Sequence, residues 1–302
     1  MAAGTSSQAL DEDQVHSQPM DARRMPVHPS PTGSRARTPS GAGPRGLVAS
    51  LIMTALLAGC GGTTGTSKVP AVEPDVTELT IDGQQAVAVA PGEGDPQALV
   101  LYLHGMDDDH EVLGEEQKRV EVVDRLVAEG YVVAASDAHF NALGNEASQQ
   151  DYIDLAATLS ERYGTSRTYL IAESMGSVAG LQIAADDSIP DVRGVAFISP
   201  LVDLDVVVGT EQEAQVLQAY DGALPTGAQN PAARPASDWA GTHLRFYLAS
   251  EDEVVDNSRN AEPFIEQVED VADVSVVECE GEHVAPSCFQ PDDLAQWFEE
   301  LA

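Results

Sequence analysis

A short segment in the middle of the chain combines an apolar run with a turn centred on a serine. Residues 168–172 (TYLIA) have the length and composition of a buried strand. The run stops at residues 173–176 (ESMG), and small residues then recur at helical spacing up to Gly180. The pattern predicts a strand, a tight turn and a helix that meet at Ser174. This restricts the chain to folds in which a strand and the following helix pack closely.

The same segment resembles the nucleophile elbow of the α/β-hydrolase superfamily, whose sharp turn exposes a serine Oγ above the sheet. The family pattern G-x-S-x-G reads Ala172-Glu173-Ser174-Met175-Gly176 here, so a methyl group replaces the first glycine where strand and helix approach. An ordinary serine that caps a helix N-terminus is the alternative interpretation. The resemblance implies that Ser174 is a nucleophile and that the amide of Met175 is one donor of an oxyanion hole.

Strands and helices alternate through most of the chain. The predicted strands are residues 98–103, 131–136, 168–172, 192–198, 243–249 and 274–279, after a hairpin over residues 78–90; the predicted helices are 115–129, 149–163, 257–268 and 291–301. Such repeats imply an α/β class with a mostly parallel sheet and helices on both faces. The resemblance implies an α/β-hydrolase domain over residues 76–302. In the helix predicted over 115–129, Val120, Val123, Leu126 and Val127 form the apolar face.

The alternation stops between residues 198 and 239. One candidate helix over 206–220 is followed by a segment that glycine and proline residues interrupt. An excursion of this length within a compact domain is usually functional. At this point of the chain it resembles the cap or lid of α/β-hydrolases, so we expect residues 200–238 to shape a substrate pocket. A solvated loop is the alternative.

Two candidate acids follow successive predicted strands. A serine nucleophile needs a base to take its proton and an acid to orient that base. In the α/β-hydrolase family these groups occur in the order serine, acid, histidine. Asp252, in the turn after residues 243–249, resembles the acid of the family. Asp203, which follows the preceding strand, is the competitor.

The base and the second oxyanion donor come from the same resemblance. Five histidines lie outside the N-terminal leader: His104, His110, His139, His243 and His283. Only His283 follows the last predicted strand, where the family has its histidine, so it is the predicted base. The pair His104-Gly105 resembles the HG motif of the family, which implies that the amide of Met106 completes the oxyanion hole. In that interpretation His104 is structural.

The N-terminal region has the pattern of an export signal. Residues 1–44 are rich in Pro, Ser, Gly and Arg, which predicts disorder, and residues 47–57 form an apolar run too short to span a bilayer. Residues 57–60 (LAGC) resemble the lipobox of bacterial lipoproteins, which implies that residues 1–59 are removed and that Cys60 carries lipid on the extracytoplasmic face of the cell membrane. We expect residues 60–75 to form a flexible tether. An ordinary signal peptide is the alternative.

Charge and cysteine content restrict the remaining possibilities. The chain has 15 Lys and Arg against 50 Asp and Glu, a net charge of −35, which excludes nucleic acid as a partner because polyanions are repelled. The acidic run Asp107–Asp109 next to His110 predicts a solvated turn, so we assign no metal and no cofactor.

If Cys60 is lipidated, Cys279 and Cys288 remain as an even pair in an exported chain, and we predict a disulfide between them. Two buried free thiols are the alternative.

Together these motifs predict a monomeric, membrane-anchored serine hydrolase that acts on a small or lipid-like carboxylic ester through an acyl-enzyme. The residues leave two alternatives open. One is a binding lipoprotein that has kept the fold without catalysis, and the other is an acyltransferase or peptidase with the same triad.

Overall fold

The computed structural model describes residues 73–302. The predicted signal peptide, the predicted lipidation site Cys60 and most of the predicted tether lie outside these residues. Among the residues described, no helix combines the length and the hydrophobicity that a membrane span requires.

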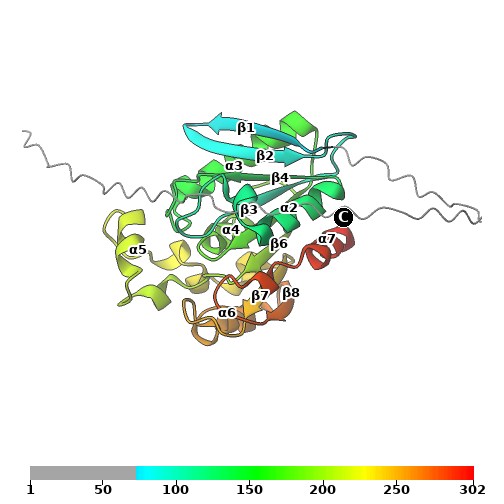
Figure 1. Ribbon diagram of the computed structural model, residues 1–302. Coiled ribbons are helices and arrows are strands. Elements are labelled where there is room, and N and C mark those ends of the chain that lie inside the picture. The colour runs from blue at the N-terminus through cyan, green and yellow to red at the C-terminus, as the bar shows by residue number, and fades with distance from the viewer. Residues whose placement is uncertain (1–72) are drawn as a thin grey trace, which may run out of the picture. The chain divides into compact units, whose positions relative to one another are not determined.

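One eight-stranded sheet forms the centre of the domain. Its strands are β1 (Asp75–Ile81), β2 (Gln84–Ala90), β3 (Ala98–Leu103), β4 (Tyr131–Ser136), β5 (Thr168–Glu173), β6 (Val192–Ile198), β7 (His243–Ala249) and β8 (Asp273–Cys279). Their order in space is β1-β2-β4-β3-β5-β6-β7-β8, and all pairs beyond β2 and β4 are parallel. Figure 1 shows the antiparallel hairpin β1–β2 along one edge and β7 and β8 at the other. The predicted mostly parallel sheet is confirmed.

Helices cover both faces of the sheet. On one face lie α1 (Val112–Glu115), α2 (Gln117–Ala128) and α7 (Pro291–Glu300); on the other lie α3 (Glu146–Tyr163), α4 (Gly176–Ala185) and α6 (Ala261–Val268). The central strands are buried on both sides, since Leu101 of β3 packs toward α3 and α4 while its neighbour Tyr102 packs toward α2 and α7. The carboxyl ends of β5, β7 and β8 therefore meet at one edge of this layered structure.

The helix predicted over residues 115–129 is two helices, because the backbone of Glu116 is extended (φ −114°, ψ 139°) and separates α1 from α2. The predicted apolar face of α2 is also partly wrong. Val123 and Leu126 are buried, but the third and fourth buried positions are Val122 and Arg119. A prediction from the hydrophobic pattern misses Arg119, because that pattern counts only apolar residues.

The excursion between β6 and β7 contains no single helix over residues 206–220. It forms a 3₁₀-helix, Leu204–Val207, and then α5 (Glu213–Ala219), with Gly209 in the left-handed region (φ 81°) between them. Val207 and Val216 of this segment pack with Met175, the residue after the predicted nucleophile. The excursion therefore contributes apolar surface close to Ser174.

Candidate active site

Ser174 lies at the turn between β5 and α4 in a left-handed backbone conformation (φ 47°). Such a conformation is uncommon for a residue with a side chain and marks a functional or strained position. The turn is held because the Ser174 N–H donates to the Ile198 carbonyl (2.9 Å) and the Leu201 N–H donates to the Ser174 carbonyl (3.0 Å). The first residue of α4, two positions after Ser174, must be a glycine. A Cβ on Gly176 would lie 2.2 Å from the Leu103 carbonyl oxygen.

The alanine at the first glycine position of the elbow is accommodated by a glycine on the helix. A Cβ placed on Gly180 of α4 would lie only 3.1 Å from the Cβ of Ala172. Because Gly180 has no side chain, the Ala172 methyl group fills that space. The departure from the G-x-S-x-G pattern therefore leaves the close packing of strand and helix intact.

His283 and Asp252 are aligned with the predicted nucleophile. The Ser174 Oγ lies 2.8 Å from His283 Nε2, and His283 Nδ1 lies 2.7 Å from Asp252 Oδ2. The Asp252 side chain is completely buried and its other oxygen accepts the N–H groups of Val254 (3.1 Å) and Val255 (2.8 Å). Since an ionised carboxylate only accepts, Nδ1 carries the proton and Nε2 is free to accept from the serine hydroxyl.

The competing acid, Asp203, lies elsewhere. Its Oδ1 accepts hydrogen bonds from the Asp205 N–H (2.9 Å) and from Asn230 Nδ2 (2.7 Å), which stabilises the start of the 3₁₀-helix in the excursion. The structure thus brings Asp252 to His283 and gives Asp203 a local capping contact.

Met106 and Met175, whose amides are the predicted oxyanion donors, line a common cavity. Met106 lies in the turn after β3 and Met175 is the N-cap residue of α4, and the same cavity is lined by Ser174 and His283. Within residues 73–302, neither backbone N–H donates a hydrogen bond to another protein group. Unpaired N–H groups at a helix start are available to an external acceptor.

The loop that carries His283 is fastened at three points. Cys279 and Cys288 form a disulfide that encloses it, the Val284 N–H donates to Ser199 Oγ (3.0 Å), and Lys118 Nζ donates to the Val284 carbonyl (3.0 Å). Cys279 is the last residue of β8, Ser199 directly follows β6, and Lys118 lies on α2. The histidine is therefore held by groups on both sides of its loop.

The cavity has a volume of about 370 Å³, which is in the range of small-molecule sites. Its lining contains apolar and charged residues. The apolar residues are Leu143, Met175, Leu201, Val207, Val254 and Val255, and the charged residues are Asp108, Glu115, Glu116, Lys118, Arg119 and Glu173. Part of the apolar lining comes from the excursion between β6 and β7.

Solved structures of other proteins have a similar fold over most of the described domain. TT1662 of Thermus thermophilus matches with a TM-score of 0.57 at 18% identity, covering 76% of this chain and 98% of the other. The fluorophosphonate-binding serine hydrolase F of Staphylococcus aureus matches with 0.60 at 11%, covering 76% and 98%. The esterase Pf2001 of Pyrococcus furiosus matches with 0.57 at 17%, covering 76% and 91%. The chain has the α/β-hydrolase fold. No protein-family model and no curated protein matches the sequence.

Beside Ser174, this α/β-hydrolase fold contains a buried polar network that the sequence analysis does not predict. The carboxylate of Glu173, which is 2% exposed, accepts hydrogen bonds from the Tyr102 hydroxyl and from Arg119 Nε (2.9 Å) and Nη2 (2.5 Å). Burial and the charge of Glu173 raise the pKa of Tyr102 well above its ordinary value, so its hydroxyl remains a donor. Burial opposes the charge on Arg119, but its hydrogen bonds and ion pair with Glu173 raise the guanidinium pKa overall.

One sequence signal could have revealed this network. Arg119 precedes Val122, Val123 and Leu126 by three, four and seven residues, which places it on the buried side of α2. A charged residue at such a position needs a buried partner. The carboxylate of Glu173 at the end of β5 is that partner.

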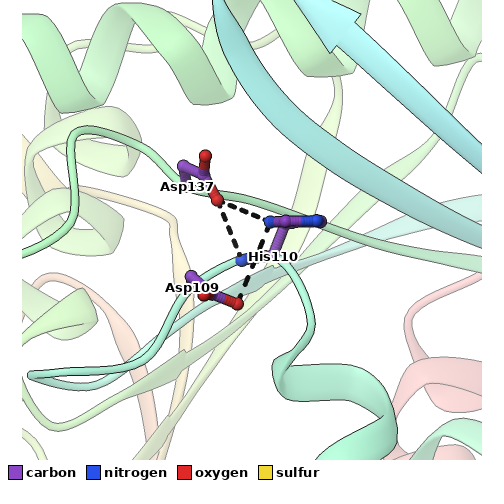
Figure 2. Close-up of side chains that lie close together, drawn as sticks. All are labelled: Asp109, His110 and Asp137. Carbon is purple, nitrogen blue, oxygen red and sulfur yellow. Dashed lines mark hydrogen bonds and ion pairs between the residues drawn. The ribbon is translucent and has the colours of Figure 1, made fainter.

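Two other histidines, His104 and His110, have local hydrogen-bond partners. His104 is buried between the carbonyl oxygens of Gly105 (2.8 Å) and Asp137 (3.1 Å), in agreement with a structural role. His110 Nδ1 lies 2.6 Å from Asp137 Oδ1 and 3.8 Å from Asp109 Oδ1 (Figure 2). Asp137 also accepts the N–H groups of His110 and Gln85. His110 Nδ1 and both carboxylate oxygens of Asp137 therefore have hydrogen-bond partners among the described residues.

Proposed function

We propose that this protein is a serine hydrolase that cleaves carboxylic esters, with Ser174 as nucleophile, His283 as general base and Asp252 as the acid that orients it. The observation that carries the proposal is the continuous line of hydrogen bonds from Ser174 Oγ through His283 to Asp252, at 2.8 and 2.7 Å, with the serine open to a cavity. Three such groups on separate loops have no structural need to be aligned.

In this proposal His283 Nε2 removes the hydroxyl proton as Ser174 Oγ attacks the ester carbonyl. The histidine then gives that proton to the leaving alcohol, which leaves an acyl group on the serine. A water oxygen then attacks the acyl carbon as His283 Nε2 takes one of its protons, and the histidine returns that proton to Ser174 Oγ when the bond from Oγ to the acyl carbon breaks and the acid leaves. Asp252 keeps the proton on Nδ1 and stabilises the positive charge that His283 acquires in each step.

The amides of Met106 and Met175 stabilise the oxyanion of the tetrahedral intermediates. Neither N–H has a protein partner in the described residues, and two such donors can contribute several kcal/mol to the transition state. No metal or cofactor is needed for these steps.

The walls of the cavity suggest a small or lipid-like ester with an apolar acyl or alcohol group. An apolar substrate segment fits against Leu143, Leu201 and Val207, and the net acidity of the chain favours neutral or cationic substrates over anionic ones.

Hydrolysis of p-nitrophenyl esters of increasing chain length tests this proposal. We expect a burst of p-nitrophenol, which reports the acyl-enzyme, and complete loss of turnover in Ser174→Ala. Ser177→Ala is a matched control because it removes a hydroxyl from the same elbow that contacts only the Ala172 carbonyl. Added alcohol acceptors and a matched amide would reveal acyl transfer or peptidase activity. Wild-type turnover that survives in Ser174→Ala would contradict the proposal, and failure to turn over any ester would favour a binding module.

We also propose that the mature protein is exported and held on the cell membrane by lipid on Cys60. The LAGC sequence after an apolar run supports this, and so does the Cys279–Cys288 disulfide, since disulfides persist in oxidising compartments. We expect the full chain expressed in bacteria to partition into detergent and to incorporate labelled palmitate. Cys60→Ser should abolish both, and a soluble wild-type product with a free Cys60 thiol would contradict the assignment.

A further inference from the structure

Arg119 connects the two segments that carry the proposed oxyanion donors. Its Nη2 donates both to Glu173 Oε1 (2.5 Å) and to Asp108 Oδ2 (2.9 Å), and its Nε donates to Glu173 Oε2 (2.9 Å). Glu173 lies two residues before Met175, and Asp108 lies two residues after Met106. One guanidinium therefore holds the elbow and the loop after β3 together.

The network lies directly against the peptide unit that contains the Met106 amide. A Cβ placed on Gly105 would lie 3.2 Å from Glu173 Oε1 and 3.4 Å from Asp108 Oδ2. The two carboxylates thus pack against Gly105, whose carbonyl carbon is bonded to the Met106 nitrogen. We therefore expect a shift of either carboxylate to move Gly105 and with it the Met106 N–H.

The network is better suited to orientation than to stability. Arg119 is 5% exposed and Glu173 is 2% exposed, and the loss of hydration of a buried ion pair offsets most of its attraction. Apolar residues of similar volume would stabilise the fold as well. The rigid fork of an arginine, however, fixes the positions of two carboxylates at once, which a lysine cannot do.

We propose that Arg119 is a positioning residue, which acts through Glu173 and Asp108 to hold the amides of Met106 and Met175 in the direction that stabilises the oxyanion. This inference rests on the proposed function, because it requires Ser174 to attack a carbonyl. Arg119 also lines the cavity, but in this role it acts through the two carboxylates and not on the reacting atoms.

Steady-state kinetics of two variants test the inference. We expect Arg119→Lys and Asp108→Ala each to lower kcat by about 10- to 100-fold, somewhat less than the loss of a whole oxyanion donor, with KM within about 3-fold of wild type. Asp108→Ala retains the buried Arg119–Glu173 pair. If Arg119→Lys fails to fold, the kcat of Asp108→Ala still tests the positioning role. Asp108→Asn keeps an acceptor for Arg119 and should recover most of the rate.

Arg125→Lys is the matched control. Arg125 lies on the same helix, is partly exposed, and pairs with Glu129 and Asp292 on the surface. We expect its kcat and KM to equal those of wild type.

Inhibition by a trifluoromethyl ketone analogue of the best ester separates positioning from general damage, because the bound hemiketal places an oxyanion in the hole. Its inhibition constant should rise in Arg119→Lys and Asp108→Ala by the factor by which kcat/KM falls. Wild-type kcat in both variants, or a loss confined to KM, would overturn the inference and leave the proposed function standing. If the wild-type enzyme cleaves no ester and Ser174 takes up no fluorophosphonate, the proposed function and this inference are both wrong.

Discussion

Two histidine–aspartate pairs in this molecule have nearly the same geometry and different surroundings. His283 Nδ1 lies 2.7 Å from Asp252, and His110 Nδ1 lies 2.6 Å from Asp137. The second nitrogen of His283 faces the hydroxyl of Ser174 in a cavity. In the described residues no serine, threonine or cysteine side chain is hydrogen-bonded to His110, and its carboxylate partners surround only Nδ1 (Figure 2).

The difference shows that an aspartate next to a histidine does not make a catalytic base. Both pairs fix a tautomer, but of the two only His283 has a serine hydroxyl on its opposite nitrogen and lines the cavity, as the proposed base requires. The pair at His110 instead connects the loop after β3 to the end of β4 and, through the Gln85 N–H, to β2. Removing members of each pair in turn tests this contrast.

The largest effect is expected from the two histidines. His283→Ala should lower kcat by about 10⁶, as loss of the base does in serine hydrolases generally. His110→Ala should keep kcat within about 3-fold, because no reacting group lies on its ring. Steady-state rates with one p-nitrophenyl ester measure both. Equal losses in the two variants would remove the distinction between the pairs.

The aspartates should differ by a smaller factor. Asp252→Asn should lower kcat by about 10⁴, since an amide stabilises the wrong tautomer of His283. Asp137→Asn should leave kcat nearly unchanged and lower the melting temperature, because its carboxylate accepts backbone N–H groups. Asp203→Asn provides a second control. Loss of activity in Asp203→Asn with full activity in Asp252→Asn would show that the acid is misassigned.

A further contrast between the pairs is the disulfide beside His283. Replacing both Cys279 and Cys288 with serine should lower the free energy of unfolding by roughly 2–3 kcal/mol, because the unfolded chain is no longer restricted. We expect kcat to fall several-fold at temperatures where the domain is still folded, since the loop of His283 loses one of its three fastenings. Circular dichroism and rates on the same samples measure this. Unchanged turnover would exclude a role for the bridge in positioning His283.

The smallest effect is expected from chelators. Asp109, His110 and Asp137 bring three potential ligand atoms together, but the oxygen of Asp137 nearest the ring already accepts hydrogen bonds from His110. We expect dialysis against EDTA to leave kcat and the melting temperature unchanged. A loss of activity that zinc or another divalent cation restores would show that this cluster binds a metal that matters.

Much of the fold follows from local patterns. The apolar runs predict β3 to β8 closely, and the Asp82-Gly83 turn predicts the first hairpin, because each signal depends on residues adjacent in the chain. The resemblance to α/β-hydrolases, with its order of serine, acid and histidine, predicts Ser174, Asp252 and His283, and the structure aligns these three residues. The order alone does not separate Asp252 after β7 from Asp203 after β6. Parallel strands end at a common edge, so residues distant in sequence meet there.

The network around Arg119 could not be predicted in the same way. Its members come from β3, β5, α2 and the loop after β3, and no local pattern relates Tyr102, Asp108, Arg119 and Glu173. The partner of a buried charge depends on three-dimensional packing. The break at Glu116, which divides one expected helix into α1 and α2, is likewise not marked by a proline or glycine at that position.

Fluorophosphonate labelling tests the central claim most directly. A fluorophosphonate reacts with a serine only where a base has activated the hydroxyl, and it needs no knowledge of the substrate. We predict one adduct per chain in the intact mass, mapped by peptide mass spectrometry to Ser174, and no adduct in Ser174→Ala or in protein unfolded before labelling. An unlabelled, folded wild-type protein, or an adduct on any other residue that persists in Ser174→Ala, would contradict the account.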